Sequence, residues 1–252
     1  MTKHYPKLLT LLGFLFLWQL VVMVFQIKEF ILPSPLKVFA HLLVPQYASN
    51  YHWLRHVRTT LGEIVISFSV TAAVGIFVAI VITWSSIFRQ IITPIITLFN
   101  SLPKIALAPL FLLWFGFGII PNIMIAFLIA FFPIVINTVA GLNAVDEDLL
   151  DLVRYLHASK WQVYLKVRLP NSLPYIFSGL KISTTLCVVG AIVGEFIAST
   201  QGLGYLIKSS QGTMDTPPMF ASLILISILG LSFFGFISFL ERWIMPWQIA
   251  RS

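Results

Sequence analysis

The 252-residue chain is 58% hydrophobic and only 10% charged, and its mean hydropathy is +0.94. Soluble domains carry about 25% charged residues, so this composition excludes a water-soluble globular protein. The net charge of +7 does not indicate nucleic-acid binding, because basic residues beside membrane spans orient those spans against anionic lipid. The chain is predicted to be an all-α polytopic membrane protein with about six transmembrane helices in a single domain, residues 1–252.

Two spans are predicted in the first third of the chain. Residues 8–25 form an uncharged apolar run after a basic start. A cleaved signal peptide begins in the same way, but no small-x-small cleavage site follows, so we expect a retained span. Residues 26–58 predict a long loop with a short amphipathic helix at 36–43. Residues 64–84 predict the second span.

The third apolar segment, residues 91–120, is too long for one straight span and contains Pro94, Pro103 and Pro109. Proline removes a backbone donor. Irregular backbone is tolerated at membrane depth only where it is buried in protein or lines a wet cavity. The segment therefore predicts a broken helix.

Three further spans are predicted at residues 123–142, 179–197 and 219–240, with a loop at 201–218. Six spans place both termini on one side of the membrane. Nine Lys and Arg residues fall in the segments that are inside if the N-terminus is cytoplasmic, against five outside. This bias predicts that both termini are cytoplasmic in a multi-pass protein of the cell membrane.

Residues 146–170 hold 4 of the chain's 9 acids and 4 of its 16 Lys and Arg residues. Three acids open this charged island, where a helix N-terminus favours negative charge. Helical spacing predicts an apolar stripe that stays on the spans, formed by Leu149, Leu152, Val153 and Leu156. Such an island predicts a docking site for a soluble partner. A helical hairpin lying on lipid is the alternative.

A second short helix is predicted within the island. Ser159 and Gln162 have the spacing of a capping box, in which each side chain bonds the other's backbone N–H. Pro170 and Pro174 are expected to end this helix. The turn between the two helices is predicted at His157-Ala158.

The island resembles the cytoplasmic loop of ATP-binding-cassette (ABC) importer permeases. Their pattern is Glu-Ala-Ala, three residues, Gly, nine residues, then Ile-x-Leu-Pro. Here Asp151-Leu152-Val153, His157 and Val167-Arg168-Leu169-Pro170 keep every spacing. Asp-Leu-Val replaces Glu-Ala-Ala, and His157 stands where the glycine supplies a left-handed turn. A non-glycine residue there costs about 1–2 kcal/mol, so we expect docking contacts to differ slightly.

Four other segments extend the resemblance. They are Leu-Pro-Ser-Pro at 32–35, Ser-Leu-Pro-Lys-Ile-Ala-Leu-Ala-Pro-Leu with Trp-Phe-Gly-Phe-Gly at 101–118, Gly-Ala-Ile-Val-Gly-Glu-Phe at 190–196, and Gly-Leu-Gly-Tyr at 202–205. Together they resemble the nitrate, sulfonate, taurine and thiamine-precursor branch of these permeases. The resemblance implies a type I ABC importer permease fold, with a core at about 54–240 and a coupling loop at 143–172.

The resemblance also implies the partners and cargo. Cytoplasmic ABC ATPase subunits, an extracytoplasmic solute-binding protein, a second copy of the permease and the lipid bilayer are expected, and no nucleic acid. ATP and Mg²⁺ would bind the ATPase, so no cofactor is expected in this chain. The sequence of residues 103–110 most resembles that of permeases for heterocycles such as thiamine pyrimidine precursors or riboflavin. Nitrate and sulfonates stay open.

The resemblance assigns ATPase-coupling roles to residues of the island. Asp151 is the charge that a basic ATPase residue would meet. The remaining coupling residues are Arg154, Tyr155, His157, Ala158, Ser159, Lys160, Trp161, Leu169 and Pro170.

Charged residues within the apolar segments predict a second site. A charge at the bilayer centre costs at least about 2.5–3.5 kcal/mol. We expect Lys104, after Pro103, and Glu195 to face the permeation pathway or its outer gate, with an ion pair between them left open. A purely structural pair is the alternative. Glu63 and Lys181 are expected to snorkel from span ends.

Several kinds of chemistry are missing from the sequence. No Gly-x-x-x-x-Gly-Lys-Ser/Thr motif is present, so ATP hydrolysis must come from another subunit and no enzymatic activity is expected here. His52 and His56 have an i, i+4 spacing, but an exposed loop explains them and no metal site is predicted. A secondary transporter or channel without an ATPase is the alternative function, although it would not explain the spacing within the island.

Overall fold

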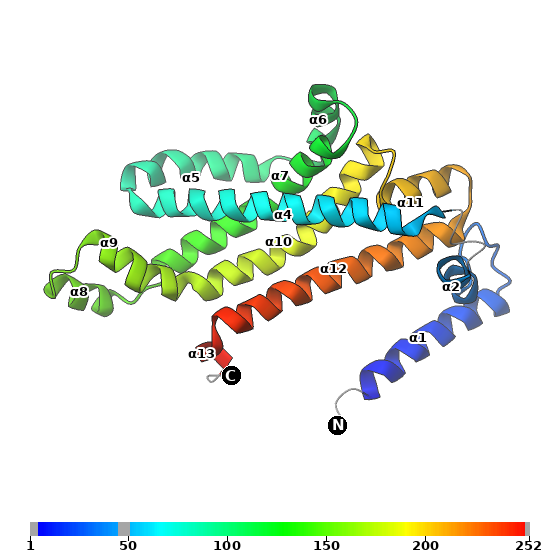
Figure 1. Cartoon of the computed structure of the whole chain (residues 1–252), viewed down its shortest axis with the longest axis horizontal. Coiled ribbons are helices and arrows are strands. Elements are labelled where there is room, and N and C mark those ends of the chain that lie inside the picture. The colour runs from blue at the N-terminus through cyan, green and yellow to red at the C-terminus, as the bar shows by residue number, and fades with distance from the viewer. Residues whose placement is uncertain (1–4, 45–50, 250–252) are drawn as a thin grey trace.

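The structure is a computed structural model that describes residues 5–44 and 51–249. The chain termini, predicted above to be cytoplasmic, and residues 45–50 of the predicted loop lie outside this part. The described chain forms an elongated helical bundle (Figure 1). Four helical segments are long and apolar enough to cross a membrane: α4 (Trp53–Trp84), α7 (Ile119–Asn143), Lys160–Ala198, which contains α10 (Leu169–Ala198), and α12 (Thr216–Ile244).

A fifth candidate span is broken, as predicted. Helix α5 (Ser86–Ser101) is followed by η1 (Lys104–Leu107) and α6 (Ala108–Phe115), and the two halves are bent by 85°. The break falls at Pro103. Pro94 lies inside α5. Pro109 lies in the first turn of α6, where a backbone N–H would have no acceptor within the helix, so a proline is tolerated there.

Helix α1 (Tyr5–Val24) occupies the position of the first predicted span and lies at the edge of the bundle (Figure 1). Trp18 packs against Phe220 of α12 with ring centroids 5.8 Å apart. The predicted amphipathic helix is present as α2 (Pro35–Leu43). It is fixed beside α4, because the indole N–H of Trp53 donates to the carbonyl of His41 at 3.0 Å.

Helices α7 and α10 pack closely, because glycines on α10 face α7. A Cβ atom added to Gly190 would lie 2.4 Å from the Cα of Ala126, and one added to Gly194 would lie 2.6 Å from the Cα of Asn122. Small residues of this kind let helices approach closely inside a membrane. Cys187, one turn before Gly190, is fully buried in the resulting core.

Helix α4 begins earlier than predicted. It starts at Trp53, so the last residues of the predicted loop 26–58 are helical. His56, Thr60 and Glu63 of its first turns are all buried, because His56 and Thr60 contact the chain where it enters α11 (Leu203–Gly212) and Glu63 contacts Asn122 of α7. The prediction that Glu63 snorkels is therefore wrong: the residue is 1% exposed.

Lys181 does not lie at a span end either. It sits in the middle of α10 and forms an ion pair with Glu241 of α12, with Nζ–Oε2 at 2.8 Å. The prediction that Lys181 snorkels is therefore wrong as well. A pattern argument could not identify its partner, because Glu241 is 60 residues away in the sequence.

Pro170 and Pro174 do not end the helix that contains them. The chain is helical from Lys160 to Ala198 through α9 (Lys160–Val163), a π-helical turn (Tyr164–Arg168) and α10. Within this turn, the N–H of Leu169 donates to the carbonyl of Tyr164, five residues back. A wider turn of this kind relieves the clash between the ring of Pro170 and the preceding turn, while Pro174 lies inside α10.

Candidate functional site

Helix α8 (Glu147–Tyr155) and helix α9 lie at one end of the molecule, away from α11 and α2 (Figure 1). Asp146 is the N-cap of α8, and its carboxylate accepts the N–H of Asp148 at 3.0 Å. This contact confirms the predicted helix start, since an acidic side chain satisfies a free donor at the positive end of the helix dipole.

The turn between α8 and α9 has the predicted geometry. His157 has φ = 56°, the left-handed conformation usually left to glycine. The N–H of His157 donates to Arg154 O at 2.9 Å, and the N–H of Ala158 donates to Val153 O at 3.0 Å. These two bonds form a Schellman motif, which ends α8 and sets the direction of α9.

The predicted capping box at the start of α9 is also confirmed. The N–H of Ser159 donates to Oε1 of Gln162 at 2.8 Å, and the N–H of Gln162 donates to Oγ of Ser159 at 3.3 Å. The turn and the box together give α8 and α9 a fixed mutual angle.

Contrary to the prediction, the apolar stripe of α8 does not pack on the spans of this chain. Leu149, Leu152 and Leu156 are 43%, 54% and 67% exposed and only Val153 is partly buried, because α8 projects from the end of the bundle. Tyr155, next to this stripe, is 81% exposed. Asp151 pairs only with its helical neighbour Arg154, at 2.7 Å, and both are exposed. We define the coupling surface as Leu149, Asp151, Leu152, Arg154, Tyr155, Leu156, Lys160, Trp161 and Leu165.

Aromatic contacts join the coupling surface to the end of α4. The ring of Trp84 lies edge-on to Trp161, with centroids 5.0 Å apart, and to Tyr164, at 5.3 Å. The hydroxyl of Tyr164 is 3.1 Å from Oγ1 of Thr83. A groove of about 370 Å³ runs between these elements and includes Ala158. The last coupling residues predicted, Leu169 and Pro170, open α10, so α9 is continuous with a span.

Lys104 lies at the bend of the broken span, beside the middle of α7. Its Nζ donates to the backbone and side-chain oxygens of Asn100, both at 2.9 Å, and lies 4.7 Å from the ring centre of Phe132. No acid pairs with it in the described chain. A groove of about 420 Å³ passes this amine, between Pro103 and Pro133.

Glu195 is not brought near Lys104, which settles the open question of their ion pair. It is fully buried near the end of α10, and its carboxylate accepts the hydroxyl of Thr60 at 2.6 Å and the N–H of Gly204. Thr60 in turn accepts the N–H of Leu203 at 2.9 Å. The first turn of α11 is thus held by side chains of α4 and α10.

The same arrangement explains the Gly-Leu-Gly-Tyr segment. Gly202 has φ = +111°, and a Cβ there would lie 2.2 Å from the carboxyl carbon of Glu195. Its N–H donates to Nδ1 of His56 at 2.9 Å, while its carbonyl already accepts the N–H of Leu206. Nδ1 of His56 also lies 3.0 Å from that carbonyl, and the ring stacks on Tyr205. The prediction of an exposed loop is therefore wrong for His56, which is buried.

We define the outer cluster as His56, Thr60, Glu63, Asn122, Glu195 and Gly202. Of these residues, sequence reasoning assigned a site role only to Glu195 and missed the other members, Glu63 and Asn122 among them. Nδ2 of Asn122 donates to Glu63 at 2.8 Å and to Ser199 at 2.6 Å. One sequence feature could have indicated the site. Thr60 and Glu63 are polar residues at helical spacing, in a helix whose beginning was predicted to be a loop.

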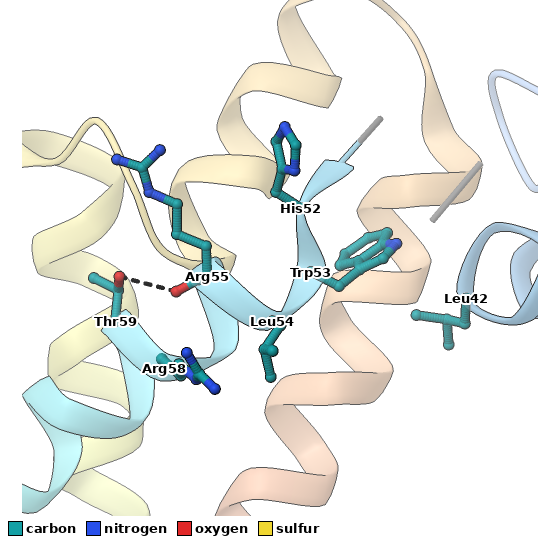
Figure 2. Close-up of a pocket in the computed structure, with 7 residues that line it drawn as sticks. All are labelled: Leu42, His52, Trp53, Leu54, Arg55, Arg58 and Thr59. Atoms are coloured by element: carbon teal, nitrogen blue, oxygen red, sulfur yellow. Dashed lines mark hydrogen bonds between the residues drawn. The ribbon is translucent and has the colours of Figure 1, made fainter. Parts of the chain in front are cut away.

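A pocket of about 680 Å³ opens at the start of α4, beside the outer cluster (Figure 2). His52, Arg55 and Arg58 line it, and Trp53 lies toward Leu42 of α2. Nε of Arg55 donates to Gln201 at 3.2 Å. The pocket is therefore cationic. Among the described residues, no group of three or more His, Cys, Asp or Glu side chains could hold a metal ion.

Comparisons with known proteins agree on the class of protein. Residues 71–246 match the family described as "Binding-protein-dependent transport system inner membrane component". The chain is 31% identical to the formylaminopyrimidine transport permease protein ThiX of Halalkalibacterium halodurans, over 88% of this chain and 87% of that protein. It is 32% identical to the riboflavin transport system permease protein RibX of Chloroflexus aurantiacus, over 95% and 88%.

A third relative is the taurine transport system permease protein TauC of Escherichia coli, 30% identical over 95% of this chain and 88% of that protein. Among solved structures, a chain of an inward-facing MetNI methionine ABC transporter superposes with a TM-score of 0.65. It is 21% identical and covers 77% of this chain and 94% of its own. This similarity confirms the predicted fold class.

Proposed function

The chain belongs to the family of inner-membrane components of binding-protein-dependent transport systems, and we propose how its parts divide the work of import. It is the membrane-spanning permease subunit of an ABC importer. In our proposal, ATP and Mg²⁺ bind a separate ATPase subunit on the cytoplasmic side, where the coupling surface and both chain termini lie. A solute-binding protein acts at the other end of the bundle.

We propose that the coupling surface docks in the ATPase. The observation that carries this proposal is the combination of exposure and rigidity: large apolar side chains are exposed, yet the turn, the capping box and the Trp84 contacts fix α8 and α9 to the spans. A projecting helix with exposed aromatic and charged residues suits a groove in a partner. Because α9 continues into α10, its displacement would move a span directly.

Tyr155→Glu tests this docking, because Tyr155 is 81% exposed. The variant should fold normally but lose the ATPase subunit on purification in mild detergent, with a loss of affinity of at least about tenfold, as for a truncated interface anchor. Leu36→Glu, at a 71%-exposed position on α2, is the matched control and should retain the ATPase. Full ATPase recovery with Tyr155→Glu would contradict the docking site.

The solute path is proposed to pass Lys104. The amine lies at the bend beside the middle of α7 and α10, in a groove of about 420 Å³ whose lining is otherwise mostly apolar. An unpaired cation at that depth is costly unless it serves a solute or water-filled path. Lys104→Met should lower uptake at unchanged ATPase binding, whereas Lys104→Arg should retain part of the uptake. Normal uptake by Lys104→Met would remove Lys104 from the path.

A second permease copy is proposed to complete this path. No side chain of α5 is buried within the chain, although the helix borders the Lys104 groove through Asn100. In a membrane, such a face meets lipid or protein. Cross-linking between two copies through cysteines placed on α5 would support the dimer, and a monomeric purified importer would contradict it.

We propose that the substrate is a small heterocycle. Two relatives with more than 30% identity are named for formylaminopyrimidine and riboflavin, and Lys104 and the Asn100 amide offer donors to ring carbonyl and nitrogen acceptors. A sulfonate is the second candidate, because the taurine permease is 30% identical. Competition between labelled pyrimidine precursor, riboflavin and taurine for ATP-dependent uptake distinguishes them. Uptake that survives ATP depletion would instead favour a secondary transporter.

A further inference from the structure

The outer cluster contains two buried acidic side chains in one hydrogen-bond network. Glu63 on α4 is 1% exposed and Glu195 on α10 is 0% exposed. Thr60, three residues before Glu63, donates to Glu195. Asn122, which donates to Glu63, packs against Gly194. The two carboxyl groups therefore lie in one network and interact electrostatically. Neither forms an ion pair among the described residues, since the three ion pairs involve Glu29, Asp151 and Glu241. Two buried negative charges in one network would be strongly unfavourable.

The hydrogen-bond donors around Glu195 identify it as the charged partner. One of its oxygens accepts the hydroxyl of Thr60, and the other accepts the N–H of Gly204. Both donors connect it to the first turn of α11, because Thr60 also accepts the N–H of Leu203. A carboxylate at the positive end of a helix dipole is stabilised there.

Glu63 has the opposite pattern. Its Oε1 accepts Nδ2 of Asn122 at 2.8 Å, but its buried Oε2 has no donor. A buried oxygen without a partner costs about 1–3 kcal/mol. If Oε2 carries a proton, it becomes a donor, and the adjacent carboxylate of Glu195 becomes its acceptor.

We propose that Glu63 and Glu195 form a buried proton-binding site, in which a proton on Oε2 of Glu63 is donated to the carboxylate of Glu195. The site then carries one negative charge, which the first turn of α11 stabilises. The proton removes the repulsion that would otherwise separate α4 from α10 and α11 at the outer end. This inference goes beyond the proposed transport function and does not depend on which solute is carried.

No cation among the described residues forms an ion pair with the site. His52, Arg55 and Arg58 of α4 line the neighbouring pocket and are exposed, and Arg55 donates to Gln201. From α4, Nδ1 of His56 faces the backbone of Gly202 and not the carboxyl groups, and from α7, Asn122 is uncharged. From α11, Tyr205 stacks on His56, and Lys208 is exposed. On α10, the only acid or base near the outer end is Glu195 itself.

The chain makes this proposal directly testable, because the other seven of its nine acids are not buried. A carboxyl group that is shielded from water therefore belongs to the pair. The seven acids that are not buried are Glu29, Asp146, Glu147, Asp148, Asp151, Asp215 and Glu241.

The experiment is infrared spectroscopy of the purified full-length chain at neutral pH, in H₂O and D₂O. We expect the C=O stretching band of a protonated carboxylic acid, shifted in D₂O and absent in Glu63→Gln. Glu147→Gln, at an exposed position of α8, is the control and should keep the band. Absence of the band from the wild-type protein would overturn the proposal, as would its persistence in folded Glu63→Gln.

Thermal unfolding separates the two roles. The side-chain amide introduced by Glu63→Gln can still donate to Glu195, so this variant should retain the wild-type melting temperature. Glu195→Gln removes the negative charge from α11 and should lower it by several degrees. Equal melting temperatures for the two variants would overturn the assignment of the proton to Glu63. If neither variant folds, the wild-type spectrum alone decides.

Discussion

The two ends of the molecule use polar residues in opposite ways. At the coupling surface, Asp151 and Arg154 are exposed and contact only each other. In the outer cluster, Glu63 and Glu195 are fully buried and bond to residues of α4, α7 and α11. The first arrangement leaves charge free for a partner. In the second arrangement, the polar groups bond to other residues of the same chain.

The difference predicts where substitutions affect folding and where they affect coupling. An exposed ion pair contributes about 0–1 kcal/mol, whereas breaking a buried polar network leaves groups unsatisfied at about 1–3 kcal/mol each. We therefore expect the outer cluster to determine the stability of the chain, and the coupling surface to determine its association.

The largest effect is expected from Gly202→Ala in the outer cluster. The residue has φ = +111°, and its Cβ would lie 2.2 Å from the Glu195 carboxyl carbon. Left-handed strain and overpacking together should destabilise the chain by about 2–5 kcal/mol, so little folded protein should reach the membrane. Gly212→Ala is the control, because nothing lies within 4 Å of its Cβ position. Similar yields for both variants would show that α11 is not held as described.

A smaller loss is expected from Thr60→Val, which keeps the shape but removes the hydroxyl. Leu203 N–H and one oxygen of Glu195 would each lose a partner, so stability should fall by about 1–3 kcal/mol. Thr59→Val is matched to it, because that hydroxyl bonds only the Arg55 carbonyl of its own helix and is not buried. Thermal unfolding in detergent measures both. An equal effect of the two substitutions would break the proposed contrast between the two ends.

Sequence patterns anticipated the coupling end in detail and the outer cluster hardly at all. The capping box of Ser159 and Gln162 involves residues close in the sequence, so spacing predicted it, and the resemblance to importer permeases implied the left-handed turn at His157. Glu63 bonds to Asn122, 59 residues away, and Thr60 to Glu195, 135 residues away. A lone acid near a predicted span end looks the same whether it snorkels or meets a partner from another helix.

At the coupling end, two features were predicted wrongly from spacing, because both depend on packing against other parts of the structure. The stripe through Leu152 and Leu156 has helical periodicity whether it covers the spans or awaits another protein. Likewise, Pro170 and Pro174 would end an isolated helix. The π-helical turn before them and the contacts of α10 with α7 keep this one continuous.

An intermediate effect is expected where the coupling surface meets the spans. Trp84→Ala would remove the ring contacts with Trp161 and Tyr164, each worth about 0.5–1.5 kcal/mol. The docking side chains themselves are unchanged, so ATPase binding should change little, while ATP-dependent uptake should fall several-fold because α9 is less rigidly attached to the spans. Trp243→Ala, at a 72%-exposed position on α12, is the control. Unchanged coupling in Trp84→Ala would mean that α9 alone transmits the motion.

The smallest effect on stability is expected from Asp151→Asn. The Asp151–Arg154 pair is about 70% exposed on both sides, and exposed pairs at this helical spacing contribute at most a few tenths of a kcal/mol. The melting temperature should therefore stay at the wild-type value. ATPase affinity should still fall a few-fold and lose part of its salt dependence, because a charge that meets a basic partner is screened by salt. Glu147→Gln, also on α8 and exposed, tests whether removing any acid from α8 lowers ATPase affinity in the same way. If Asp151→Asn lowered stability as much as Thr60→Val, the exposed pair would be structural, and the contrast between the two ends would fail.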